Sequence, residues 1–206
     1  METRMQNSET PSGILRAEHQ TILRVVEILR RLVARSREGR GFERAALARC
    51  VEFFRAFADA CHHAKEEDLL FPVLESRGIP REGGPIGVML YEHSLAREHT
   101  RDMGEALDAE QRGEASAVAR FHEAADRYIS LLTQHIFKEN EVLFNMGDRV
   151  MTPGDQQSLC ERFCETGCRS FGGKSRAQLE QLADDLESQW EHAWPHKHAI
   201  APRRMV

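Results

Sequence analysis

Apolar residues recur at alternating steps of four and three in four long stretches of the chain, the spacing of one helix face. Strict alternation of apolar and polar residues, which would indicate half-buried strands, is nearly absent. The pattern predicts helices over residues 12–37, 42–74, 86–112 and 116–146, separated by short segments rich in glycine and other loop formers. Helices of this length with short connections form antiparallel bundles. We therefore expect an all-α fold built on an antiparallel four-helix bundle.

Two further helices are expected after the bundle. Thr152 and Pro153 place an N-cap residue before a proline at the first helical position. Ser175 and Gln178 have the spacing of a capping box, and the helix that they begin should end near Pro195. The expected organisation is a disordered N-terminus (1–11), the bundle (12–150), a helical extension (151–194) and a tail (195–206).

Polar residues interrupt all four apolar faces at corresponding places. Each face carries one histidine, and two faces carry a glutamate one helical turn further on. These six residues are His19, His62, Glu66, His93, His135 and Glu139. Buried carboxylates without partners are strongly destabilising, and no lysine or arginine lies on these faces at the same level. A bound cation would neutralise them, so we expect the six side chains to be metal ligands.

A repeated motif strengthens this expectation. Residues 62–71 read HHAKEEDLLF and residues 135–144 read HIFKENEVLF, so both follow His-x-x-Lys-Glu-x-acid-apolar-Leu-Phe. The other two histidines each follow a glutamate, in AEH at 17–19 and YEH at 91–93. Two helical hairpins related by a pseudo-twofold axis would bring four histidines and two glutamates into one layer. Two carboxylates that can bridge suit two metal ions better than one.

The motif offers two adjacent histidines at its first copy. His62 with Glu66 aligns with the second copy of the motif. His63 with Glu67 has the same i, i+4 spacing, but its face runs back through Asp59 and is expected to be more exposed. We therefore predict His62, and not His63, as the ligand.

Composition excludes several classes of protein. The 206 residues have a net charge of −5, with no basic field that would favour nucleic acid or an anionic membrane. Apolar runs are too short for a membrane-spanning helix, and the N-terminus has no apolar segment typical of secretion. Five cysteines suit a reducing compartment better than a disulfide scaffold. We expect a cytoplasmic protein with neither nucleic acid nor membrane as partner.

The order of these motifs resembles the hemerythrin-like HHE cation-binding domains. The resemblance rests on HHAKEEDLLFP (62–72), GPIGVMLYEH (84–93) and HIFKENEVLF (135–144), and covers roughly residues 12–165. It implies a non-haem, oxo- or hydroxo-bridged di-iron centre, with iron rather than zinc or manganese. In that centre the six residues named above would be the ligands, and Glu66 and Glu139 would bridge the ions.

One departure from the family pattern bears on function. The oxygen-carrying hemerythrins of marine invertebrates have a further histidine one turn after the third-helix ligand, where this chain has Arg97. Fewer protein ligands would leave a metal position open, which favours reactivity over carriage. The resemblance is therefore closer to bacterial hemerythrin-like proteins, including those of iron–sulphur repair and nitric oxide handling. Repair proteins usually carry a cysteine-bearing domain ahead of the bundle, and 11 residues are too few for one.

Other chemistry-bearing residues have plainer interpretations. Cys160, Cys164 and Cys168 share a helix face, and packing is expected, with thiol redox chemistry or a metal site as alternatives. Cys50 and Cys61 are expected in the core. The stretch WEHAWPHKHA (190–199) holds three histidines whose expected role is weak metal binding at most, namely His192, His196 and His198. Tyr128 is expected to be a core tyrosine, and His99 and His122 lie off the ligand faces.

Three classes of function remain open from the sequence. The centre could bind or sense O2, NO or peroxide; it could turn over peroxide or NO as an enzyme; or it could store and donate iron, including to cluster repair. A reactive centre would also need an electron-donor protein as partner. Replacement of a ligand by Arg97 favours a small-ligand site over storage.

Overall fold

The computed structural model of the protein describes residues 10–167 and 169–191. The predicted tail (195–206), the three histidines of residues 190–199, and most of the predicted disordered N-terminus (1–11) lie outside these residues. Helix α1 begins at Pro11, with the Thr10 hydroxyl accepting a hydrogen bond from the Gly13 amide at 3.1 Å. The first helix therefore starts one residue earlier than its predicted position.

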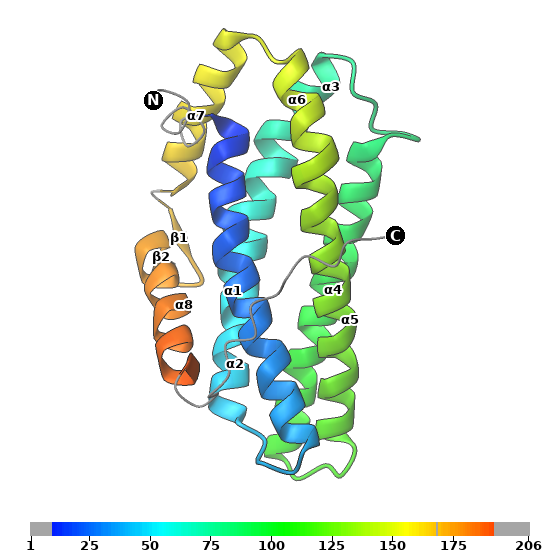
Figure 1. Ribbon diagram of the computed structural model, residues 1–206, viewed down its shortest axis with the longest axis vertical. Helices are drawn as coiled ribbons and strands as arrows, with labels where there is room; N and C mark the ends of the chain where they lie inside the picture. Colours follow the sequence, from blue (N-terminus) through cyan, green and yellow to red (C-terminus); the bar gives the residue numbers. More distant parts are fainter. Residues whose placement is uncertain (1–9, 168, 192–206) are drawn as a thin grey trace, which may run out of the picture.

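Four long helical segments form the body of the protein, and the predicted all-α class is confirmed. They pack against one another and are joined by connections at alternating ends of the long axis (Figure 1). The first is α1 (Pro11–Arg37) and the third is α4 (Pro85–Gln111). The second comprises α2 (Arg44–Phe53), η2 (Phe54–His63), η3 (Glu66–Leu70) and α3 (Phe71–Ser76). The fourth comprises α5 (Ala117–Lys138), η4 (Glu139–Leu143) and α6 (Phe144–Val150).

The second and fourth segments contain three π-helical elements, η2, η3 and η4, which the sequence pattern did not predict. A π-helical turn holds more residues than an α-helical turn, so the residues after it are displaced around the axis. The apolar face expected to continue through Leu69 instead continues through the fully buried Leu70. In the fourth segment Val142 is 48% exposed, whereas Leu143 is buried. The predicted ligand faces are thus wrong by one residue beyond each glutamate, because each π-helical turn adds one.

The extension contributes two helices, α7 (Pro153–Gly167) and α8 (Arg176–Glu191), separated by a short hairpin of β1 (Ser170–Phe171) and β2 (Lys174–Ser175). Gly172 and Gly173 both have positive φ, 57° and 81°, as a two-residue hairpin turn requires. The predicted capping box is present: the Ser175 amide donates to Gln178 Oε1 at 2.8 Å, and the Gln178 amide to Ser175 Oγ at 3.3 Å. α8 lies along α1 and α2 (Figure 1).

Two groups of buried side chains fill the interior, one on each side of the polar layer that holds the histidines. The larger group includes Phe53, Phe54, Phe57, Phe121 and Tyr128, and buries residues of α8 such as Leu179 and Leu186. The smaller group gathers Leu15, Phe71, Ile86 and Phe144 with Leu159 and Phe163 of α7. Among the described residues, no helix is both long enough and apolar enough to cross a membrane.

Candidate metal centre

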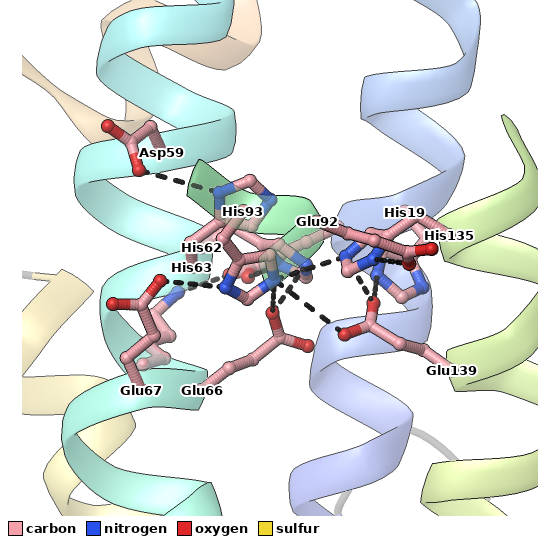
Figure 2. Close-up of polar contacts among 12 residues, drawn as sticks. His19, Asp59, His62, His63, Glu66, Glu67, Glu92, His93, His135 and Glu139 are labelled. Atoms are coloured by element: carbon pink, nitrogen blue, oxygen red, sulfur yellow. Dashed lines mark hydrogen bonds and ion pairs between the residues drawn. The ribbon is translucent and has the colours of Figure 1, made fainter. Parts of the chain in front are cut away.

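The six residues expected to bind metal lie together between the four helical segments, and a seventh, His63, joins them (Figure 2). α1 contributes His19, α4 contributes His93, and the second and fourth segments contribute the His–Glu pairs. All seven side chains are at most 2% exposed. Residues from four separate segments therefore form one buried polar layer.

The donor atoms form two groups, and within each group the atoms lie within 4.8 Å of one another. The first group is His19, His62, Glu66 and Glu139; the second is His63, Glu66, His93 and His135. Glu66 belongs to both groups. Its Oε2 lies 3.6 Å from His62 Nε2 and 3.5 Å from His93 Nε2, so one carboxylate faces a histidine of each group.

Glu139 also reaches both groups. Its Oε2 lies 3.1 Å from His19 Nε2 and 3.3 Å from His135 Nε2, while Oε1 lies 3.9 Å from His93 Nε2. The two glutamates thus occupy the space between the histidine rings. Each is placed where a carboxylate could touch two ions, one in each group.

His63 corrects the prediction that it would be more exposed than His62. Its side chain is 2% exposed, and its ring stacks on His93 with centroids 3.8 Å apart. Both adjacent histidines face inward because η2 is π-helical up to His63, which changes the angle between successive side chains. The His-His pair and the i, i+4 spacing to Glu67 were the available signals, but an α-helical projection misplaced them.

Four of the five histidines have a hydrogen-bond partner outside the layer at Nδ1, which fixes the orientation of their rings. His62 Nδ1 lies 3.0 Å from Glu18, and His135 Nδ1 lies 3.0 Å from Glu92. His93 Nδ1 meets Glu67 at 2.7 Å, and His19 Nδ1 meets Asn140 at 2.9 Å. His63 is the exception, because its Nδ1 lies 3.4 Å from Asp59 without a hydrogen bond between them. An outer acceptor holds the proton on Nδ1, so the lone pair of Nε2 is free to bind a metal ion.

Other residues of the repeated motif support this layer. Lys65 pairs with Glu18, and Lys138 pairs with Glu92, so each motif lysine neutralises the glutamate of the opposite Glu-His pair. Each motif phenylalanine stacks on a histidine: Phe144 on His19 at 5.5 Å and Phe71 on His93 at 6.0 Å between centroids. Each copy of the motif supplies a His–Glu pair, one outer cation and one covering ring, and the first copy adds His63.

Arg97, at the position of the missing histidine, turns away from the layer. Its guanidinium donates to Asp59 and to Glu67, each at 2.7 Å. Glu67 in turn accepts from His93, and Asp59 faces His63. Arg97 therefore holds the carboxylates that face His93 and His63. His63 belongs to the same donor group as His93, so this group contains three histidines even though position 97 is an arginine.

Burial favours the neutral forms of His62, His63 and Glu66, whereas Glu139 is shifted toward its charged form. Burial lowers the pKa of His62 to about 4 and that of His63 well below its ordinary value. Burial also raises the pKa of Glu66, and the neighbouring charge of Glu139 raises it further. For Glu139 the rings of His135 and His19 outweigh burial and lower the pKa. Two adjacent buried carboxyls favour one shared proton unless a cation neutralises both.

The residues present fit a metal centre. Among the buried atoms that have no hydrogen-bond partner within the described residues, six lie between the histidine rings: His19 Nε2, His62 Nε2, and both carboxylate oxygens of Glu66 and of Glu139. Buried polar atoms are rarely left in this state. Unpaired imidazole nitrogens and carboxylate oxygens that converge on one volume are the donor set that iron, zinc and manganese take in proteins.

Comparison with known families agrees with this geometry. The "Hemerythrin HHE cation binding domain" matches residues 10–146, which is more than half of the chain. The protein therefore belongs to the hemerythrin HHE cation-binding family. Comparison with curated protein sequences gives no match.

The remaining chemistry-bearing residues lie apart from the centre. Cys50 and Cys61 are buried in the core, as predicted, and so is Tyr128. Cys164 is exposed, so the expected packing role is wrong for this cysteine, whereas Cys160 is partly buried. The buried residues of α7 include Leu159 and Phe163. Cys168 lies outside the described residues. His122 bonds Ser36 far from the ligand layer, and neither His122 nor His99 belongs to a donor group.

Proposed function

We propose that the protein is a non-haem di-iron protein whose centre binds a small diatomic or peroxidic ligand: O2, NO or peroxide. The observation that carries this proposal is the pair of donor groups that share Glu66. Shared carboxylates favour two ions held close together over two separate sites. In this proposal Glu66 and Glu139 would be the carboxylates shared between the ions, and His19, His62, His93 and His135, joined by His63, would hold them through imidazole nitrogens.

The donor count supports an open position at the centre. Five imidazole nitrogens and four carboxylate oxygens make nine donor atoms from the seven residues. Two ions in octahedral geometry take about twelve donors between them. The remaining positions are open to solvent-derived bridges and to one small ligand. Bound iron would supply electrons to such a ligand, and the surrounding side chains would set the shape and polarity of the ligand site.

The rest of the chain is consistent with this role. We propose that the four helical segments form a hemerythrin-type antiparallel bundle (12–150) made of two related hairpins, followed by a separate helical extension (151–194). We further propose a cytoplasmic location, with an electron-donor protein as partner and with neither nucleic acid nor membrane. The net charge of −5 supports the absence of a nucleic-acid partner.

Exposure of the reduced protein to each ligand separately tests the proposal. Iron-loaded protein is reduced anaerobically, and its absorption spectrum is followed as O2, NO or peroxide is added. A saturable spectral change with one of them, reversed when that ligand is removed, supports binding or sensing. Turnover of peroxide or NO that stops in His93→Ala and Glu139→Ala supports an enzyme instead. Iron lost to a chelator within minutes would favour storage, and an unchanged spectrum with all three ligands would refute the proposal.

A further inference from the structure

Two outer charge arrangements support the two halves of the metal layer, and they differ in one respect. Glu18 accepts from His62 and pairs with Lys65; Glu92 accepts from His135 and pairs with Lys138. These residues occupy equivalent places in the repeated motif. Glu18 and Lys65 are fully buried, however, whereas the side chain of Glu92 is 12% exposed and that of Lys138 is 36% exposed.

The extension adds a third charged group to the first arrangement alone. Arg176, the first residue of α8, places Nη1 3.3 Å from Glu18 Oε1, the same oxygen that faces Lys65. No corresponding arginine pairs with Glu92 among the described residues. Arg176 follows the part of the chain that matches the family, residues 10–146, so this contact comes from outside the family domain.

Arg176 is held in place by local structure on both sides. The β1–β2 hairpin packs Phe171 into the core, the capping box at Ser175 starts α8, and Glu180 accepts from Arg176 Nε at 2.9 Å. Leu179 and Leu186 then bury α8 against the bundle. The side chain of Arg176 is 32% exposed, and its guanidinium reaches inward to a carboxylate that has no exposure.

The two halves therefore differ in charge. Beside His62, one carboxylate faces two cations, −1 + 1 + 1 = +1, whereas beside His135 one carboxylate faces one cation, −1 + 1 = 0. Glu180 offsets part of the first sum, but its side chain is 42% exposed and screened by water. A cation on Glu18 weakens this carboxylate as an acceptor for the Nδ1 proton of His62. A weaker acceptor makes the His62 Nε2 a poorer donor to a metal.

We propose that Arg176 is a positioning residue through which the C-terminal extension tunes the His62 side of the metal centre, acting through Glu18. The inference rests on the proposed metal function and goes beyond it, because it assigns a role to a segment outside the family domain. Arg176 weakens metal binding at His62 and favours the reduced state of the ion there. The half that contains His135 has no such control from the extension.

Three variants of the full chain test the proposal. Arg176→Gln removes the charge and keeps a polar side chain; Arg176→Lys keeps the charge. Arg24→Gln is the matched control, because Arg24 joins α1 to α8 through Asp184 and Glu187, each at 2.8 Å, without touching Glu18. Each protein is loaded with ferrous iron, its iron content is measured, and two quantities follow: the rate of iron extraction by excess chelator, and the midpoint potential.

The expected change in iron release is opposite in direction to the change that a loss of packing would cause. Arg176→Gln should release iron about tenfold more slowly than wild type and have a lower midpoint potential, the scale typical of changes behind a metal ligand. Arg176→Lys and Arg24→Gln should match wild type. Faster release in Arg176→Gln, or equal effects of Arg176→Gln and Arg24→Gln, would overturn the proposal. Unchanged release and potential in Arg176→Gln, with wild type holding two irons, would overturn it and leave the metal function intact. A wild type that holds no iron would overturn both.

Discussion

Replacement of Lys65 by methionine should destabilise the protein far more than the same change at Lys138. Both lysines occupy the fourth position of the repeated motif, and each pairs with a glutamate of the opposite Glu-His pair. Lys65 and Glu18 are fully buried, and removal of one partner of a buried pair costs about 3–5 kcal/mol. Arg176 and His62 still face Glu18, so we expect the lower end, about 3 kcal/mol. Lys138 is 36% exposed, and its loss should cost about 1 kcal/mol or less.

Urea unfolding of the full chain, followed by helical circular dichroism at equal metal loading, measures the difference. Bound metal stabilises the folded state by mass action, so loading must be matched between variants. The double variant Glu18→Gln/Lys65→Met should recover much of the lost stability, because it leaves no unpaired buried charge. Equal losses in Lys65→Met and Lys138→Met, or additive losses in the double variant, would refute the idea that burial decides the strength of the pair.

Three further predictions follow from burial. His63→Ala should weaken iron binding at least about tenfold, whereas His122→Ala should leave it unchanged; competition with a chelator measures both. Burial raises the pKa of Cys50 from 9.0 to about 12, so the buried thiol stabilises the fold fully below pH 9 and loses this contribution as the pH rises toward 12. The difference in unfolding free energy between wild type and Cys50→Ala, measured in urea, should therefore be smaller at about pH 10.5 than at about pH 8. An equal difference at the two pH values would contradict the raised pKa. Phe144→Ala should cost about 3–5 kcal/mol and Phe137→Ala about 0.5 or less, because Phe144 is buried on His19 and Phe137 is 65% exposed; similar melting temperatures for the two variants would argue against that packing.

Helix periodicity was sufficient to predict the fold class and most of the metal layer. The alternating steps of four and three predicted the helices within a few residues, and capping signals located the starts of α7 and α8. The six predicted ligand residues all lie in the two donor groups, although His62 falls within η2 and Glu66 and Glu139 begin η3 and η4. That these residues bind metal remains a prediction.

The misplacement of His63 and that of Val142 share one physical cause. An α-helical projection assumes a constant angle between successive residues, and π-helical turns break this assumption. His63 was therefore expected outside the layer, and Val142 inside it, although the structure has the reverse. The outer partners Glu18 and Arg176 were also missed, because their contacts join residues 158 positions apart (176 − 18 = 158) that no local pattern connects.

The central claim is that two donor groups sharing Glu66 hold two irons. Elemental analysis of the purified full chain, for iron, zinc and manganese together, tests it most directly. The account predicts about two irons per chain, from one ion in each of the two groups, and a loss of both in Glu66→Gln because this carboxylate belongs to both groups. A single metal per chain, zinc in place of iron, or Glu66→Gln with its full iron content would contradict it.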